Sequence, residues 1–518
     1  MSDDDAVYDL SPFRRALVLV VVMSATTIYS SSILISSALL PKLQGALSAT
    51  QDEVSWTMTF NIVATAVVTP MTGWLAERFG RRATMVWSAM IFGVSTFFCG
   101  ASSSLEELIF WRVIQGGAGA PLVPLSQAIL LDTYPRRQHN LVMAIFGMAN
   151  MIGPSIGPTI AGEISDAFGW RWGFWMILPV AILTVIGCQF AIPRRATRGS
   201  ARLDWSGFLT LAIAIACAQF IFSRGQRLDW FESTEIVAAA FLAVVAFYMF
   251  IVHSLTAKKP FVSLSLFTDR NYALGMCLVF IFGMLNFAPV VLLPPLLQNH
   301  AGYPDTAIGI FIGWRGLGTL LGFFIAMLTA RVDPRLMMMV GFFLQGYGGY
   351  QMMLFDLNVG ESRLAIWSVV QGAGIGVTWV PMTIVTFYTL RADLRAEAMA
   401  MFHLLRNFGS SLFISIAVAE IVRATGNNYA RMAEYVSPYN KLWNMPWATG
   451  SWSVDTIEGM ARFAKEISRQ AILIGYVNAF WMYAVVGFIA IPLCLLARLP
   501  KRMTSQPERS SATANPTR

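Results

Sequence analysis

The sequence predicts an all-α membrane protein with fourteen transmembrane helices, arranged as two six-helix halves plus an inserted helix pair, with both termini cytoplasmic. The first reason is composition: 56% of the 518 residues are hydrophobic and 13% are charged, whereas soluble domains average about 45–50% apolar residues. The second is that the apolar residues form separate runs long enough to cross a bilayer. The third is that lysine and arginine gather on alternate connections between these runs.

Each predicted span is an apolar run bounded by charged or turn-rich residues. A helix needs about 20 residues to cross a hydrocarbon core of about 30 Å. Backbone polar groups in hydrocarbon must be satisfied within the segment, so spans of this length are helices. The runs cover residues 16–40, 54–75, 83–101, 107–131, 141–163, 172–192, 206–222, 234–255, 272–297, 307–330, 336–355, 364–390, 397–422 and 472–497.

Positive charges predict the orientation, because short cytoplasmic loops are enriched in lysine and arginine. With the N-terminus inside, the cytoplasmic segments hold 23 of these residues and the outer segments hold 11, including six in the long outer loop 423–471. Both termini are therefore expected in the cytoplasm. The net charge of +8 reflects this distribution and does not indicate nucleic-acid binding, which needs basic residues on one soluble face.

An internal repeat divides the predicted spans. RVIQGGAGA in the fourth run aligns with SVVQGAGIG in the twelfth, so that Gln115 and Gly116 match Gln371 and Gly372. Parallel six-helix repeats are a common transporter architecture, with the binding site between the halves. The predicted parts are a cytoplasmic N-terminus (1–15), an N-terminal half (16–193), inserted helices (203–255), a C-terminal half that includes the outer loop (270–500) and a disordered tail (503–518).

Charged residues inside predicted spans are the clearest functional candidates. A central arginine costs about 2.5–3.5 kcal/mol on insertion scales and needs an interior partner. Arg112, Arg315 and Arg406 therefore either bond to carbonyls of neighbouring helices or line a central cavity. His403 lies three residues before Arg406 and is either a proton-titrating group or a polar filler.

The fifth run contains a glycine- and proline-rich stretch, GMANMIGPSIGPTIAG. Small residues at every fourth position allow close helix packing, and each proline deletes a backbone hydrogen bond and bends the helix. Its GPSIG matches the GxSxG of hydrolases, but that motif needs a strand and a sharp turn, so no enzyme activity is predicted. The residues singled out are Gly153, Pro154, Gly157, Pro158 and Gly162.

The loop after the second run reads GWLAERFGRR. In a helix, Glu77 and Arg81 would have the i,i+4 spacing of an ion pair, and the cations would lie at the favourable C-terminal end of a helix. Ordinary positive-inside charge is the alternative explanation.

Taken together, these motifs resemble the major facilitator superfamily. GWLAERFGRR is similar to the signature between helices two and three, with Glu77 where aspartate is more usual. Arg112, Gln115 and Gly116 resemble the fourth-helix RxxQG pattern, and GMANMIGPSIGPTIAG resembles the fifth-helix antiporter motif. With the WRW at 170–172 and RNFGSS at 406–411, the chain resembles the fourteen-helix drug:proton antiporter branch over about residues 14–500.

The resemblance implies a multi-pass inner-membrane transporter that exports drugs or other small amphipathic compounds in exchange for protons by alternating access. No cofactor or metal is expected, because the five cysteines lie singly in apolar runs without a histidine at metal spacing. The implied transport and coupling residues are Arg112, Gln115, Arg315, Arg406 and His403. The implied conformational latch is Gly73, Glu77, Arg78, Gly80 and Arg81, while the glycines and prolines of the fifth run would prevent leak.

One departure from the family pattern concerns the first helix. Members often carry an aspartate where this chain has Ser32, and a serine cannot bind and release a proton near neutral pH. The carboxylates of Glu107, Glu163 and Glu420 fall near the outer ends of their spans. A facilitator or importer of the same fold that is not driven by protons therefore stays open, as does a non-transporting membrane sensor or enzyme.

The outer loop 423–471 contains Trp443, Trp447 and Trp452 with charges between them. This pattern predicts a short interfacial helix. Resemblance to exporters that work with a periplasmic adaptor and an outer-membrane channel makes the loop a candidate docking surface. An aromatic belt that rests on the membrane is the alternative.

Overall fold

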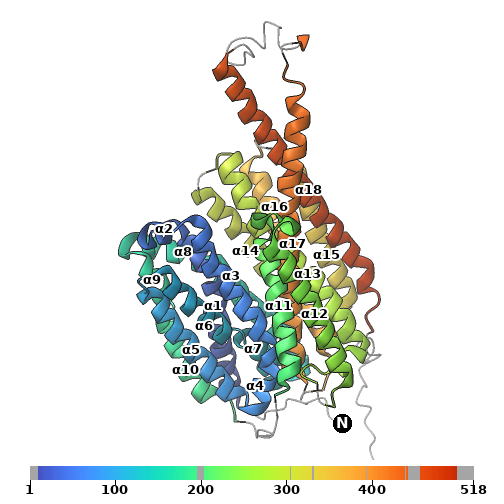
Figure 1. The fold of residues 1–518 in the computed structure, drawn as a ribbon. Coiled ribbons are helices and arrows are strands. Elements are labelled where there is room, and N and C mark those ends of the chain that lie inside the picture. The colour runs from blue at the N-terminus through green and yellow to red at the C-terminus, as the bar shows by residue number, and fades with distance from the viewer. Residues whose placement is uncertain are drawn as a thin grey trace, which may run out of the picture.

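The computed structural model describes residues 10–194, 203–258, 260–303, 305–329, 332–356, 358–391, 394–437, 439–441 and 456–498. Over these ranges the chain is helical and contains no strand (Figure 1). The elements are α1 (Pro12–Ala38), α2 (Leu40–Leu47), α3 (Gln51–Val68), η1 (Thr69–Met71), α4 (Thr72–Arg78), α5 (Arg81–Ala101), α6 (Leu105–Gly119), α7 (Leu122–Thr133), η2 (Arg136–Gln138), α8 (His139–Phe168), α9 (Trp170–Trp175), α10 (Leu178–Ala191), α11 (Trp205–Arg224), η3 (Gly225–Leu228), η4 (Trp230–Glu232), α12 (Thr234–Thr256), η5 (Leu264–Thr268), α13 (Arg270–Pro295), η6 (Leu296–His300), α14 (Asp305–Leu328), α15 (Pro334–Met353), α16 (Glu361–Phe387), α17 (Arg395–Ala433) and α18 (Ile457–Cys494).

Within the described ranges, twelve helical segments are long and apolar enough to cross a membrane. Each coincides with one of the predicted runs. The two other runs form α8 and α15, helices of 30 and 20 residues. In α15, glycines and polar side chains interrupt the apolar residues, which lowers its hydropathy without shortening it.

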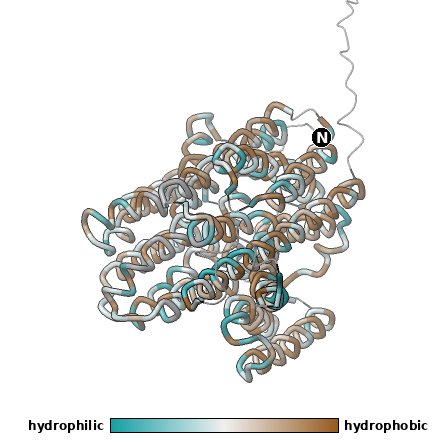
Figure 2. The backbone as a smooth tube through the Cα atoms, turned by 90° about the horizontal axis from the view of Figure 1, so that it is seen from above, coloured by the Kyte–Doolittle hydropathy of each residue, from teal (hydrophilic) through white to brown (hydrophobic). Residues whose placement is uncertain are grey.

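Apolar side chains cover the outside of the bundle as well as its core. Leu183, Phe241 and Leu255 are 67%, 72% and 70% exposed, which a soluble protein would rarely tolerate over so large a surface. Figure 2 looks along the bundle and shows hydrophobic residues on its outer helices. These outward faces are what lipid would contact.

The helices run between two ends of the bundle. At one end, here the terminal face, α1 begins and α18 ends, and the Asn271 side chain at the start of α13 is hydrogen-bonded in both directions to the Arg498 backbone at 2.9 Å. Tyr134 after α7 donates to the Arg15 carbonyl at 2.8 Å, so α1, α7, α13 and α18 all have an end there. The opposite end, beyond which α17 and α18 project, is called the hairpin face (Figure 1).

The predicted outer loop 423–471 is helical at both of its ends, while its location outside the membrane stays a prediction. Helix α17 continues to Ala433 and α18 already begins at Ile457, where Thr456 caps it by accepting from the Gly459 N–H at 3.1 Å. At about 1.5 Å per residue each helix is nearly 60 Å long, about twice the hydrocarbon thickness. Hydropathy marks where the apolar residues stop, whereas the helix continues with polar residues. The two helices form a projecting hairpin in Figure 1.

Some predictions fall on residues outside the description. Trp443, Trp447 and Trp452 are among these, as are the tail 503–518 and the first nine residues. The interfacial helix, the aromatic belt and the disordered tail therefore stay predictions.

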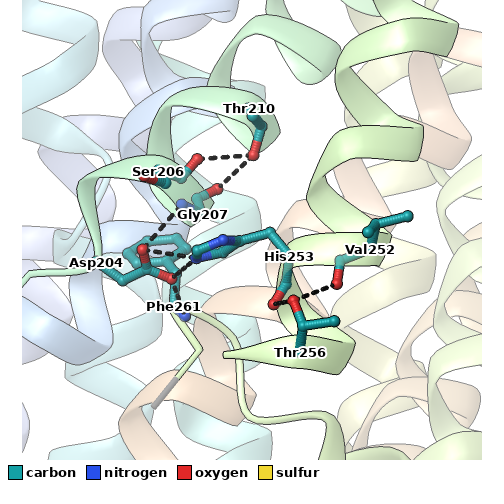
Figure 3. Close-up of polar contacts among 8 residues, drawn as sticks. All are labelled: Asp204, Ser206, Gly207, Thr210, Val252, His253, Thr256 and Phe261. Atoms are coloured by element: carbon teal, nitrogen blue, oxygen red, sulfur yellow. Dashed lines mark hydrogen bonds and ion pairs between the residues drawn. The ribbon is translucent and has the colours of Figure 1, made fainter. Parts of the chain in front are cut away.

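The inserted pair α11–α12 is tied together at the terminal face by one carboxylate (Figure 3). Asp204 caps α11 by accepting from the Gly207 N–H at 3.0 Å, and its two oxygens lie 2.9 and 2.8 Å from Nε2 of His253 in the last turn of α12. It also accepts from the Phe261 N–H at 3.1 Å, so the connection toward α13 is held at the same point.

The inserted pair packs beside the seam between the N-terminal helices (α1–α10) and the C-terminal helices (α13–α18). On one side, the Phe220 ring of α11 stacks on Trp56 of α3 with centroids 6.1 Å apart. On the other, Phe222 meets Phe408 of α17 at 5.1 Å. The pair therefore touches both sets.

Candidate functional site

Near the terminal face, two arginines from different helix sets share one buried carboxylate. Asp132 lies in the last turn of α7 and is fully buried. Arg395 at the start of α17 donates to its Oδ1 at 2.5 Å, and Arg81 at the start of α5 pairs with its Oδ2. The triad connects the N-terminal helices to the C-terminal helices. Asp132 was not predicted as a site residue. Its signal in the sequence is a single acidic residue directly after an apolar run.

The predicted helical pairing of Glu77 with Arg81 is wrong. Gly80 has φ +85°, a backbone conformation that favours glycine, and it separates the end of α4 from the start of α5. Glu77 and Arg81 are therefore not on one helix, and Arg81 pairs with Asp132. Glu77 and Arg78 are exposed at the turn.

Gly73 lies where α4 meets α17. A Cβ atom on Gly73 would come within 2.9 Å of Cα and Cβ of Glu397, so only glycine permits this approach. Glu397 also accepts from the Ser263 N–H at 2.6 Å, which connects the segment before α13 to the same point. Together with the Asp132 triad, this contact is called the latch below.

Farther into the bundle, α7 and α17 meet again through His403 and Gln127. His403 Nε2 lies 2.6 Å from Gln127 Oε1, and the two side chains are 2% and 0% exposed. The sequence placed His403 beside Arg406 but gave no means of finding Gln127, because 276 residues separate the partners.

A small central pocket lies between the two helix sets, and Arg406 is its charged side chain. The arginine Cζ lies 5.5 Å from the Trp379 ring centroid, and Nε and Nη2 donate to Asn407 Oδ1 at 3.3 and 3.2 Å. None of the described lining residues is an acid. They are Gly147, Asn150, Met151, Phe282, Phe323, Ile375, Trp379 and Arg406.

Arg112 bonds inside the N-terminal helices and is absent from that lining. Its side chain is fully buried. Nη1 donates to Gln115 Oε1 at 2.5 Å and to the Ser32 carbonyl at 3.2 Å, and Nε donates to the Thr57 carbonyl at 3.4 Å. Arg112 thus connects α1, α3 and α6 through neutral oxygens, which is the carbonyl-bonding alternative of the sequence prediction. It binds the backbone carbonyl of Ser32.

Arg315 has the corresponding place in the C-terminal helices. Its Nε donates to Gln371 Oε1 at 2.7 Å, its Nη2 bonds to the Asn286 carbonyl, and Gln371 Nε2 donates to Tyr483 Oη at 2.8 Å. Arg315 therefore connects α13, α14 and α16, and α18 through Gln371. Like Arg112, it is not among the lining residues of the central pocket.

The aligned glycines of the two sets make matching contacts. A Cβ on Gly116 would lie 2.3 Å from the Asn61 carbonyl oxygen of α3, and one on Gly372 would lie 2.1 Å from the Arg315 carbonyl oxygen of α14. Both glycines therefore allow one helix to press on the backbone of another.

The glycine-rich stretch lies in α8, a single helix from His139 to Phe168. Gly153 packs on the Thr27 carbonyl of α1 and Gly157 packs on Ser31, with hypothetical Cβ contacts of 2.8 and 2.9 Å. Gly162 has no such neighbour among the described residues, and Pro154 is half-buried. The side chain of Pro158 lies outside the description.

The profile of the Major Facilitator Superfamily matches residues 18–414. The chain belongs to the major facilitator superfamily. As a member of this superfamily it is a transporter and not an enzyme, and its helical spans make it a multi-pass protein of the inner (plasma) membrane.

Similar superfamily proteins include drug exporters. The multidrug export protein EmrB of Escherichia coli (strain K12) is 32% identical over 90% of this chain and 92% of its own length. EmrB of Haemophilus influenzae is 30% identical over 88% and 90%. The fatty acid resistance protein FarB of Neisseria gonorrhoeae is 28% identical over 90% and 92%.

Solved structures of the superfamily share the fold. The proton:xylose symporter XylE superposes with a TM-score of 0.60 at 13% identity, over 93% of this chain and 95% of XylE. The human organic anion transporter MFSD10 gives 0.59 at 13% identity, over 94% and 100%. At this identity the similarity concerns the fold alone.

Proposed function

We propose that this transporter exports drugs or other small amphipathic compounds in exchange for protons by alternating access. The observation that carries the proposal is the central pocket, which lies between two helix sets that the latch joins at the terminal face. Such a pocket becomes accessible from either side of the membrane when the sets rock against each other. Relatives named as multidrug export proteins supply the direction of transport.

The proposed topology has fourteen spans with both termini, and hence the terminal face, in the cytoplasm. The twelve apolar segments together with α8 and α15 support the number, and the excess of lysine and arginine supports the orientation. The matching contacts of Gly116 and Gly372 support two related halves, α1–α10 and α13–α18, with α11–α12 inserted. The latch then closes the cytoplasmic side in this state.

The central pocket, which in this closed state has room for about one water molecule, would widen to bind the substrate when the halves move apart. Phe282, Phe323 and Trp379 offer an aromatic lining, which suits the apolar part of an amphipathic compound. Arg406 offers one positive charge with no acid among the described lining residues, so the pocket favours amphipathic anions over cations. One relative is named for resistance to fatty acids, which are amphipathic anions.

The other predicted site residues would hold the halves rigid or control their movement. Arg112 with Gln115, and Arg315 with Gln371, would keep each half rigid through their hydrogen bonds. Gly153 and Gly157, with Pro154, Pro158 and Gly162 on the same helix, would keep α8 sealed against α1. The turn formed by Gly73, Glu77, Arg78, Gly80 and Arg81 would open and close the latch.

The projecting hairpin of α17 and α18 is the proposed docking surface for a periplasmic adaptor that leads to an outer-membrane channel. On the proposed topology it extends into the periplasm, about 30 Å beyond the hydrocarbon core. Ends of long helices at this height offer a partner a surface that lipid does not cover.

A facilitator of the same fold is the second candidate, and Ser32 favours it. The Ser32 hydroxyl donates to the Tyr29 carbonyl of its own helix at 2.7 Å, and a serine does not titrate near neutral pH. Position 32 of the first helix therefore supplies no proton-binding group in this chain.

Reconstitution in liposomes separates the two functions. The purified transporter is given an imposed pH gradient, with 8-anilinonaphthalene-1-sulfonate (ANS) as an amphipathic anion and ethidium as a cation. We expect ANS to move against its own gradient, an uncoupler to abolish this movement, and Arg406→Gln to remove the preference for ANS over ethidium. Downhill movement that ignores the pH gradient would instead establish the facilitator.

A further inference from the structure

We propose that the hydrogen bond between His403 and Gln127 is a proton-sensitive bolt, which favours the closed arrangement of the two halves while His403 is neutral and gives way to an open, hydrated arrangement when His403 is charged. The inference rests on the proposed function, because proton exchange gives the bolt its role. His403 would then be the proton-binding residue, because Ser32 does not titrate near neutral pH.

The geometry defines how the neutral bolt is made. A histidine ring has one N–H and one bare nitrogen when neutral. Because Gln127 Oε1 accepts at 2.6 Å, Nε2 of His403 carries the hydrogen and Nδ1 is the bare nitrogen. Nδ1 is buried and finds no hydrogen-bond partner among the described residues. A proton can therefore add at Nδ1 without first displacing another partner.

The surroundings do not stabilise a charged ring. On its own helix, Arg406 lies one turn away and is a cation, while Phe402 is apolar. Trp379 of α16 meets the ring at 5.9 Å between centroids. From α7 comes Gln127, and from α8 comes Met143, whose Sδ lies 3.8 Å from Gln127 Nε2. None of these described neighbours is an acid.

The nearest carboxylate along α7 is already shared. Asp132 is five residues beyond Gln127 and pairs with both Arg81 and Arg395. A protonated His403 would thus be a second cation beside Arg406 in a site of low dielectric, where like charges repel strongly. Contact with water would stabilise the charged ring, and separation of α7 from α17 would provide it.

The position of the bolt explains how its opening would reach both the latch and the pocket. Arg395 precedes His403 by eight residues on α17, which is about 12 Å along the helix, and Asp132 lies about 8 Å from Gln127 along α7. On the other side, His403 contacts Trp379, which lines the central pocket. Separation of α7 from α17 at the bolt therefore loosens the latch and changes the pocket wall together.

This arrangement gives an exchange of one proton for one substrate. A proton that reaches Nδ1 from the periplasmic side leaves Nε2–H as a donor, but the charged ring is better stabilised in the hydrated arrangement in which α7 and α17 have separated, so protonation shifts the population toward a terminal face open to the cytoplasm. The same proton leaves to the cytoplasm once substrate has bound, and neutral His403 bonds to Gln127 again. The terminal face closes, and the substrate is released outward.

Spin labels across the terminal face test the bolt. Labels are attached to Phe79→Cys and Phe267→Cys, which are exposed positions on opposite halves, after replacement of the five native cysteines. Distances are measured in the full-length protein at about pH 8 and pH 5, the range in which histidine gains its charge. In the otherwise unmodified protein, we expect the long-distance population to rise roughly ten-fold at the lower pH.

Two variants distinguish an effect of His403 protonation from a general loosening of the contact between α7 and α17. His403→Gln keeps a donor for Gln127 but cannot gain charge, so the distance should stay short at both pH values. Gln127→Leu removes the acceptor, so the long-distance population should be raised at both pH values. The control His300→Gln changes a half-buried histidine at the other end of the bundle and should behave like the unmodified protein.

A pH-dependent distance change that survives in His403→Gln would overturn the bolt. Reconstituted transport distinguishes this from failure of the proposed function. If distances respond to pH only when His403 is present, but no ANS moves against its gradient, then the bolt stands and proton-driven export is wrong. If His403→Gln still drives uphill ANS transport, the bolt is wrong and the proposed function stands.

Discussion

Asp132→Asn is expected to destabilise the protein and abolish transport. Asp132 is fully buried and is the shared partner of Arg81 and Arg395, so its loss leaves two arginines near the terminal face without their carboxylate. Removing one member of a buried ion pair typically costs about 3–5 kcal/mol. Opening of the latch would let water reach both arginines, so the variant should favour the open terminal face. Thermal unfolding in detergent and transport in liposomes measure the two effects.

Asp166→Asn is the matched control for this prediction. Asp166 pairs with Lys42 at 2.5 Å, but its side chain is 77% exposed, and exposed pairs contribute at most about 1 kcal/mol. It should melt and transport almost as the unmodified protein does. An Asp132→Asn protein with unchanged melting and transport would show that the triad does not hold the latch.

Arg112→Lys is expected to reduce transport about as severely as Arg112→Ala. Arg112 donates in three directions, to Gln115 and to the carbonyls of Ser32 and Thr57. A lysine ammonium is a point charge and cannot reproduce this planar fork, so retaining the charge does not retain the connection. Loss of two or three buried hydrogen bonds, at about 1–3 kcal/mol for each acceptor left unsatisfied, should lower transport at least ten-fold.

Measurement of transport at equal membrane abundance checks this expectation. Arg171→Lys is the control, because Arg171 makes one long hydrogen bond of 3.3 Å to the Ser102 carbonyl and is exposed. If Arg112→Lys transports normally while Arg112→Ala does not, charge alone is what the site requires.

Much of the fold could be predicted from the sequence, because lipid imposes a simple rule on apolar runs. All fourteen predicted runs are helical, although the run 107–131 is divided between α6 and α7 and the run 172–192 between α9 and α10. The projecting hairpin could not be predicted in this way, since hydropathy reports where lipid contact ends and not where backbone hydrogen bonding ends. The pairing of Glu77 with Arg81 failed because one glycine in a left-handed conformation ended the helix between them.

The candidate site was only partly predictable for a different reason. Intramembrane arginines stand out because they are costly, so Arg112, Arg315 and Arg406 were found. Arg112 and Arg315 connect helices within one set, whereas Arg406 lines the pocket. This difference depends on the direction in which each side chain points in the bundle. Asp132 and Gln127 could not be singled out from the sequence, because each bonds to a residue more than 250 positions away.

A reversible cross-link across the latch tests the central claim most directly, namely that the terminal face must open in each transport cycle. Phe79→Cys, in the turn after α4, and Phe267→Cys, in η5, are exposed positions at this face, and a bis-maleimide linker that contains a disulfide joins them. Single-cysteine proteins provide the controls, in a background without the native cysteines. We predict that cross-linking stops ANS transport and that a reductant, which cleaves the linker, restores it. A fully cross-linked protein that still transports ANS would contradict the account.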